Sequence, residues 1–311
     1  MKIFLIGKTG SINHWLEDAI AAFRDDGHKV GVGVVRRAWL DAGLESAMAE
    51  PLAASMAGTA TRFAPDLILT IGGFHAATPF LERLAALPGR PPLVGWVGDL
   101  FDKSARRAAE LYDLVAYTDS ALVARHGELG FPSRTMFLPH AANPGPALPP
   151  AERTRRMVFV ANATPGRRAI VGSIAAPISV FGPGWTVEAI GGHDIHPGRV
   201  AHRRVAGLYA GHLASLNIRN EFNVLNGLNQ RSFDPYLSAT PVVTDSQADL
   251  ERCFEPGKQV LVYRDADELN GLYDRLLRDP AEAVRIGAAG RRRVMAEHTF
   301  AHRLAALRAA L

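Results

Sequence analysis

The chain has 311 residues, 48% of them hydrophobic and 21% charged, so it can bury a sizeable core and is long enough for two domains. Its formal charge is only +4, and its lysines are scattered at positions 2, 8, 29, 103 and 258. Without a basic stripe, and with the run 291–293 interpreted as the solvated side of a late helix, we expect no nucleic-acid partner.

The single cysteine, Cys253, excludes an intramolecular disulfide and a multi-cysteine metal site. The N-terminus has no signal-peptide pattern, and no run approaches the 18 apolar residues that a membrane-spanning helix needs. The sequence therefore predicts a cytoplasmic protein with no transmembrane segment.

The first half of the chain alternates short apolar runs with stretches of helical spacing. The runs are typical of buried parallel strands and cover 2–7, 29–35, 66–73, 92–98 and 114–118. Helical spacing follows, for example in "HWLEDAIAAF" and "SALVARHGEL". Strand and helix repeated in this way indicate a doubly wound α/β sheet.

A proline-rich stretch, "LPHAANPGPALPPAERTRR" at 138–156, interrupts this rhythm and is expected to be a linker. After it the pattern resumes, with predicted strands at 157–161, 178–182, 213–218, 240–245 and 259–263. We therefore predict two Rossmann-like doubly wound domains that face a cleft.

Ligands of such sheets bind beyond the carboxyl ends of the strands, so the turns after strands are the candidate sites. The first turn contains Gly7-Lys8-Thr9 but fails the phosphate-loop spacing, because Lys2 stands where its first glycine is required. Asp99 follows the fourth strand and is either a base or substrate contact or a helix N-cap, a role for which Asp102 competes. His140, in the linker, either faces a substrate or makes a structural hydrogen bond.

Two patterns resemble metal sites. Asp265 and Asp267 form an acid-any-acid pair, but Asp265 with Glu268 also spells a capping box at a helix start, which we favour. A loose cluster of His193, Asp194, His196 and His202 lacks the one-turn spacing of a zinc-binding helix, so we favour a surface loop there over a metal site. We predict no metal site.

The stretch "NGLNQRSFD", at 226–234, follows a buried strand and is predicted to open a helix near Asn229. Gly227 would let the backbone approach a ligand, the first N–H groups of the helix would be unpaired, and Arg231 would add an anion donor. Together they suit a diphosphate, and Asp234 could accept hydrogen bonds from the vicinal hydroxyls of a ribose. The alternative is an Asn-capped helix with an exposed arginine.

The same stretch resembles the donor-site motif of GT-B glycosyltransferases of group 1 type, in particular their CgeB-like (spore maturation protein-like) relatives. Gly227 matches the glycine of E-G-F-G, and Asp234 stands where a second glutamate follows eight residues after the first. The variant motif N-x-R-x-F-E is matched by Asn229, Arg231, Phe233 and Asp234. "VFVANATPGRR", "VFGPGW" and "TPVVTD" are similar to further motifs of the donor domain in the same order, and "LPHAAN" in the N-terminal half is similar to the same relatives. Asn226 departs from the pattern, because it replaces the glutamate that touches the donor sugar.

The resemblance implies a metal-independent transferase without a cofactor that moves a sugar from a nucleotide diphosphate sugar to an unidentified glycan, protein or small molecule. Residues 1–145 would hold the acceptor and 146–298 the donor, with a helix at 299–311 packing back on the first domain. Arg167 or Arg168, with Gly227, Asn229 and Arg231, would bind the diphosphate and Asp234 the ribose. Asp99, and second to it His140, would be the catalytic base. A nucleotide-sugar epimerase of the same fold and a non-catalytic nucleotide-sugar binder remain as alternatives.

Overall fold

The computed structural model describes residues 1–9, 14–36, 45–74, 78–145, 152–186 and 192–311. The chain divides into two compact units, Met1–Pro139 with Phe300–Leu311, and His140–Thr299. The turn after the first strand and the centre of the proline-rich stretch lie outside the described residues. In the described part of the chain, no helix has both the length and the apolar character needed to cross a membrane.

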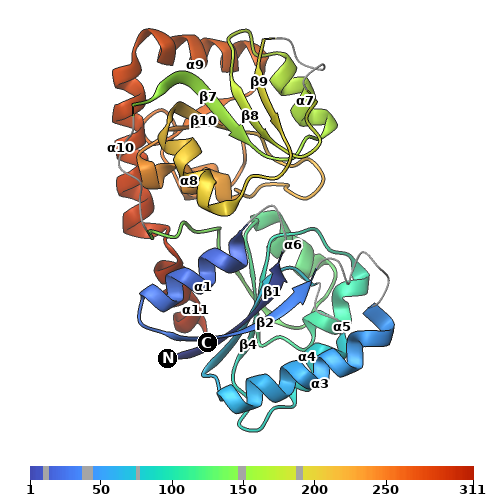
Figure 1. Cartoon of the computed structure of the whole chain (residues 1–311). Helices are drawn as coiled ribbons and strands as arrows, with labels where there is room; N and C mark the ends of the chain where they lie inside the picture. The colour runs from blue at the N-terminus through green and yellow to red at the C-terminus, as the bar shows by residue number, and fades with distance from the viewer. Residues whose placement is uncertain (10–13, 37–44, 75–77, 146–151, 187–191) are drawn as a thin grey trace. The chain divides into compact units, whose positions relative to one another are not determined.

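The first unit is built on a six-stranded parallel sheet in the order β2-β1-β3-β4-β5-β6. Its strands are β1 (Lys2–Thr9), β2 (Lys29–Arg36), β3 (Leu67–Gly72), β4 (Leu93–Val97), β5 (Leu114–Tyr117) and β6 (Arg134–Phe137). Its helices are α1 (Trp15–Asp25), α3 (Glu45–Phe63), α4 (Thr78–Ala85), α5 (Arg106–Ala109), α6 (Ser120–Glu128) and α11 (Phe300–Ala310) (Figure 1).

The central strands β3, β4 and β5 are buried on both faces of this sheet, which explains why they are continuous apolar runs. Successive residues of β1 point to opposite faces, and Phe4 and Ile6 pack in the core with α3 and α4. On the other face, α1 and the last helix, α11, pack together, and Phe300 makes edge-on ring contacts with Phe23 and Trp96. Arg303 of α11 fastens the helix further, since its Nε donates to the carbonyl of Pro139 over 2.8 Å.

The second unit contains another six-stranded parallel sheet, in the order β12-β11-β10-β7-β8-β9. Its strands are β7 (Thr154–Val160), β8 (Ser179–Gly182), β9 (Asp194–Pro197), β10 (His212–Asn217), β11 (Val242–Asp245) and β12 (Leu261–Tyr263). Its helices are α7 (Pro165–Gly172), α8 (His202–Ala210), α9 (Ala266–Arg278) and α10 (Pro280–Glu297). The chain winds one way from β7 and the other way from β10, so the switch point of the sheet lies between these two strands.

The predicted α/β architecture with two Rossmann-like sheets is confirmed. Two short strands escaped the sequence analysis, β6 and β9, and the expectation of a surface loop around His196 was wrong because Asp194–Pro197 pairs with β8. The helix predicted from about Asn229 was also wrong. Two 3₁₀ helices take its place, η3 (Gln230–Ser232) and η4 (Asp234–Ser238).

Candidate functional site

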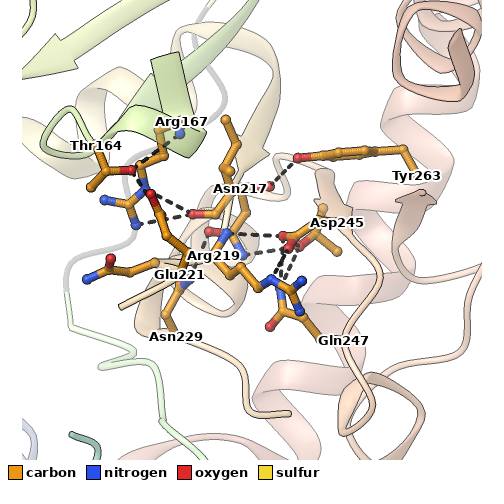
Figure 2. A network of polar contacts seen from close by, with 12 residues as sticks. Thr164, Arg167, Asn217, Arg219, Glu221, Asn229, Asp245, Gln247 and Tyr263 are labelled. Carbon is orange, nitrogen blue, oxygen red and sulfur yellow. Dashed lines mark hydrogen bonds and ion pairs between the residues drawn. The ribbon is translucent and has the colours of Figure 1, made fainter. Parts of the chain in front are cut away.

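The candidate site lies at the carboxyl edge of the second sheet, where the segments that follow β7, β10 and β11 come together (Figure 2). These are the loops on either side of the switch point, which is the usual position of a ligand in a doubly wound sheet. Long-range hydrogen bonds join the three segments, and they centre on two side chains, Asn217 at the end of β10 and Glu221 four residues later.

Asn217 is fully buried, and its amide group is completely used. Its Nδ2 donates to the hydroxyls of Ser232 (3.0 Å) and Thr244 (3.2 Å), and its Oδ1 accepts from Nδ2 of Asn229 over 3.0 Å. The hydroxyl of Tyr263 donates to its backbone carbonyl over 3.2 Å. Asn217 thus positions the segment that contains the predicted donor motif against the ends of β11 and β12.

Asp245, at the end of β11, is held by three donors and one cation. Its Oδ1 accepts from the backbone N–H of Arg219 (3.1 Å), from Nε2 of Gln247 (3.0 Å) and from the hydroxyl of Thr244 (3.5 Å), while Nε of Arg219 lies 3.4 Å from Oδ2. Burial nevertheless raises the pKa of Asp245, against the opposing effect of these donors. The carboxylate is fixed in place but costly to ionise.

Arg167, near the start of α7, is buried and fully engaged with main-chain and side-chain oxygens. Nε and Nη2 donate to the carbonyl of Ile218 (3.3 and 3.2 Å), and Nη1 donates to the carbonyl (3.2 Å) and Oδ1 (2.7 Å) of Asn162. Burial, followed by the nearby charge of Arg231, lowers the pKa of Arg167 to about 9. Two guanidinium groups therefore share one region of the site, at mutual electrostatic cost.

Glu221 joins the segment after β10 to the start of α7. Its Oε2 accepts from the hydroxyl of Thr164 (2.9 Å) and its Oε1 from the backbone N–H of Gly166 (3.0 Å). Partial burial alone would raise the pKa of Glu221, but hydrogen bonds from its own N–H, Thr164 and Gly166, together with Arg167, hold that pKa below its ordinary value. A side chain at 166 would crowd this contact, since an added Cβ would lie 2.9 Å from Oε1.

The segment predicted to bind the donor, 226–234, is therefore not an α-helix. Asn229 stands at the N-cap position of η3, but its Oδ1 caps no backbone N–H there; its Nδ2 donates to Asn217, which fixes the amide in another orientation. Asp234 opens η4, whose second residue is Pro235 and whose C-cap, Ala239, has a left-handed backbone with φ of 52°. A three-residue 3₁₀ turn aligns few peptide dipoles, so the α-helix N-terminus that was predicted to bind the diphosphate is not formed.

Three buried polar atoms of this site have no hydrogen-bond partner within the described part of the chain. They are Oδ1 of Asn229, Nε of Arg231 and Oε1 of Gln247. Burial also lowers the pKa of Arg231, while Tyr209, Asp234 and Asp245 act to raise it. Buried polar groups are nearly always paired in folded proteins, so three orphans in one region indicate a place for a polar ligand or ordered water.

The remaining residues predicted for the donor site are placed as follows. Arg168 lies over the ring of Trp185, 5.5 Å from its centroid, and donates to the carbonyl of Gly184, so its guanidinium is directed to the β8 side. Gly227 is buried within the segment. The carbonyl of its neighbour Asn226 accepts from the N–H of Asp249 over 3.0 Å, which brings the segment after β11 against the predicted donor motif.

The two predicted catalytic residues belong to different units of the chain. Asp99 is half-buried, two residues after the end of β4. The N-cap of the following 3₁₀ helix, η1 (Lys103–Ala105), is Asp102, which accepts from the N–H (2.8 Å) and hydroxyl (2.6 Å) of Ser104. Of the two aspartates that competed for the cap, Asp102 takes it. His140 is buried at the start of the second unit.

The two metal-like patterns have structural roles. Asp265 caps α9, with Oδ1 accepting from the N–H of Glu268 over 2.9 Å, while Glu268 reaches back to the N–H of Arg264. His193 bonds the carbonyl of Val171, and His196 stacks on Phe181 beside Asp194. Across the described ranges, no group of three His, Cys, Asp or Glu residues could hold a metal ion.

A family model described as glycosyl transferase-like matches residues 153–309, which is just over half of the chain and includes the whole candidate site. The chain belongs to the glycosyl transferase-like family. The predicted GT-B relationship is thus confirmed at the level of this family, whereas the CgeB-like subgroup stays a prediction. No curated protein matches the chain significantly in sequence.

Several solved glycosyltransferase structures share the fold of this chain over nearly the whole length of both proteins. HepE from Anabaena, solved in complex with UDP and glucose, has a TM-score of 0.71 and 15% identity, with 100% of both chains covered. Sucrose-phosphate synthase from Thermosynechococcus elongatus has a TM-score of 0.69 and 14% identity, covering 100% of this chain and 98% of its own. A glycosyltransferase from Rickettsia africae has a TM-score of 0.68 at 8% identity, covering 99% and 97%. At these identities the likeness concerns the fold.

Four site residues were missed by the sequence analysis, namely Asn217, Glu221, Asp245 and Gln247. Two of them carried a usable signal, because Asn217 and Asp245 are polar residues at the carboxyl ends of buried strands. Glu221 and Gln247 gave none. The partner of Glu221, Gly166, is 55 residues away, and Gln247 lies in a loop, three residues after Thr244, where no motif marks it.

Proposed function

We propose that this protein is a glycosyltransferase that takes a sugar from a nucleotide diphosphate sugar and transfers it, without a metal ion, to an acceptor bound by the first unit. The observation that carries the proposal is the pair Arg167 and Arg231 at the switch point, where a buried Nε of Arg231 lacks a partner within the described residues. Two neighbouring guanidinium groups with an unused donor suit a dianionic ligand group such as a diphosphate.

The two arginines would have different roles in donor binding. Arg167 donates to the carbonyl of Ile218 and to Asn162, so it supplies positive charge from a fixed position. Arg231 would contact the diphosphate and stabilise the negative charge that develops on it as the glycosidic bond breaks, which is the role a metal ion has in other transferases. Asp234, which interacts electrostatically with Tyr209, would accept the hydroxyls of the ribose.

The acceptor side rests on Asp99, with His140 as the second candidate. Asp99 follows a central parallel strand, and the neighbouring Asp102 rather than Asp99 provides the N-cap. A half-buried carboxylate at the carboxyl edge of a sheet is suited to accept a proton from an acceptor hydroxyl. The fold neighbour HepE was solved with UDP, UDP-glucose and glucose, so uridine nucleotides are the first donors to test.

The test is calorimetric titration of UDP, GDP, TDP, ADP and CMP into the wild type and Arg231→Ala, with and without Mg²⁺. We expect one nucleotide diphosphate to bind independently of Mg²⁺, and Arg231→Ala to weaken it by about 1.5–3 kcal/mol, the range for a hydrogen bond to a charged group. Arg285→Ala is the control, since Arg285 is exposed on α10 and pairs with Asp279. Equal affinities of wild type and Arg231→Ala would place the diphosphate elsewhere.

Turnover separates a transferase from the alternatives. A transferase releases the nucleotide diphosphate from the matching nucleotide sugar, faster in the presence of its acceptor. An epimerase would convert the sugar without an acceptor and keep the nucleotide attached. Binding with neither reaction across a broad acceptor set would indicate a non-catalytic binder, consistent with asparagine at position 226.

A further inference from the structure

We infer that Oε1 of Gln247 accepts a hydrogen bond from a hydroxyl group of the transferred sugar. The inference rests on the proposed function and concerns the sugar end of the same site. It starts from the orientation of one buried amide. The side chain of Gln247 is 5% exposed, and its Oε1 has no hydrogen-bond partner in the described part of the chain.

The orientation of this amide is fixed by its neighbours. Nε2 of Gln247 donates to Oδ1 of Asp245 over 3.0 Å and to the hydroxyl of Thr244 over 3.3 Å. A carboxylate only accepts hydrogen bonds, and the Thr244 hydroxyl donates its single proton to the same carboxylate. Both neighbours therefore require the N–H side of the amide, so Oε1 must point away from them.

Asn229 presents a second amide oxygen of the same kind. Its Nδ2 donates to Oδ1 of Asn217, and its own Oδ1 is buried without a partner within the described residues. Asn217 in turn donates to the hydroxyl of Thr244, and the same hydroxyl accepts a hydrogen bond from Nε2 of Gln247. The two unused oxygens are thus presented by one connected network (Figure 2).

The chemistry of these atoms selects their ligand. Two unused acceptors require O–H or N–H donors, and a diphosphate at neutral pH has none, whereas a sugar carries several hydroxyl groups. The unused Nε of Arg231 requires an acceptor, which a phosphate oxygen supplies. A ligand with a phosphate next to a polyol satisfies both requirements. A nucleotide diphosphate sugar has a polyol on each side of its diphosphate, namely the ribose, which Asp234 would bind, and the transferred sugar.

The backbone also links Gln247 to the predicted donor motif, since the N–H of Asp249 donates to the carbonyl of Asn226. Because Oε1 of Gln247 is shielded from solvent, a hydroxyl reaches it only when the surrounding segments shift slightly. The contact would therefore form with the complete donor and not with the nucleotide alone.

The experiment compares UDP with UDP-glucose, titrated calorimetrically into the wild type, Gln247→Met and Gln259→Met. Methionine keeps the length of glutamine but removes both the oxygen and the nitrogen of its amide group. Gln259 is the matched control, because its Oε1 already accepts from the N–H of Glu255 over 2.9 Å. We expect Gln247→Met to lower the affinity for UDP-glucose about three- to tenfold, the effect of one hydrogen bond, and to leave UDP unchanged. Gln259→Met should change neither.

Monodeoxy analogues of UDP-glucose identify the contact directly. One of them should bind the wild type about three- to tenfold more weakly than UDP-glucose and bind wild type and Gln247→Met equally. If Gln247→Met does not fold, Gln247→Ala is interpreted in the same way.

The inference is overturned if the variant loses UDP and UDP-glucose affinity by the same factor, or keeps both. These results leave the proposed function intact, because UDP still binds the wild type. A wild type that binds neither ligand would instead refute the proposed function for uridine donors, and the contact with it.

Discussion

Asn217 and Thr244 are joined side chain to side chain, with Nδ2 of Asn217 donating to the hydroxyl of Thr244 over 3.2 Å. Asn217 is the last residue of β10, and Thr244 is the last but one of the neighbouring strand β11. Through this bond the segment after β10 and the segment after β11 are held in register at the carboxyl edge of the sheet. The stability of the site should therefore depend on an uncharged amide in the strand itself.

We predict that Asn217→Ala lowers the free energy of unfolding of the second unit by about 3 kcal/mol, because it leaves several buried groups without partners at about 1–3 kcal/mol each. Urea unfolding followed by far-UV circular dichroism measures the loss. Asn220→Ala is the control, since its Oδ1 accepts a single 3.3 Å bond from the N–H of Phe222. Equal small losses in the two variants would contradict a central role for Asn217.

Glu221 should give the protein a pH-dependent contribution to stability. Its folded-state pKa is lowered by hydrogen bonds, so its contribution is fully present above the unfolded pKa of about 4.3 and is lost as the pH falls through the folded value. The melting temperature of Glu221→Gln should therefore lie below that of the wild type at pH 6–7, and the gap should close below about pH 4.

Gly166→Ala provides the internal control for this effect, because the added Cβ would lie 2.9 Å from the carboxylate of Glu221. In the Gly166→Ala background the Glu221→Gln substitution should change the melting temperature little at any pH. A gap of the same size in both backgrounds would mean that the carboxylate does not act through the start of α7.

Two helical glycines should respond to alanine with opposite signs. At Gly287 of α10 an added Cβ would lie 2.0 Å from the backbone carbonyl oxygen of Ala239, which ends η4. We expect Gly287→Ala to cost about 1–3 kcal/mol through overpacking. At Gly271 of α9 nothing lies within 4 Å of the added atom, so Gly271→Ala should stabilise by about 0.5–1 kcal/mol through helix propensity. Thermal melts of both variants test the pair.

The architecture could be predicted from the sequence because parallel strands that are buried on both faces consist of continuous apolar runs. Two strands that the sequence analysis missed show where this pattern no longer predicts a strand. β6 ("RTMF") and β9 ("DIHP") have only four residues each. β6 is partly buried and β9 is mostly exposed, so neither position requires a long apolar run. Their pairing with β5 and β8 is decided by the rest of the sheet.

The candidate site was only partly accessible. The sequence singled out the segment around Arg231, whose role stays a prediction. The helix expected there was wrong, because the amide of Asn229 donates to Asn217 and Pro235 follows too soon for a regular helix. The hydrogen bonds that build the site, such as Glu221 to Gly166, connect residues far apart in sequence. Such contacts depend on strand order, which a single sequence does not display. The predicted roles of Asp234, Asp99 and His140 stay predictions.

The role of Asp99 can be separated from that of its neighbour by two substitutions. If Asp99 is the base that accepts the proton of the acceptor hydroxyl, Asp99→Asn should reduce kcat at least about 100-fold, the lower range for loss of a general base. Its affinity for the nucleotide diphosphate should stay unchanged, since the proposed donor site belongs to the other unit. Release of the nucleotide diphosphate in a coupled assay, with calorimetry alongside, measures both quantities.

Asp102→Ala is the matched control. Asp102 lies three residues later, and its Oδ1 accepts from the N–H and the hydroxyl of Ser104. It should lower the melting temperature slightly through loss of the N-cap and leave kcat near the wild-type value. A kcat for Asp99→Asn within a few-fold of the wild type would remove Asp99 as the base, and the same measurement on His140→Gln would then decide whether the second candidate takes its place.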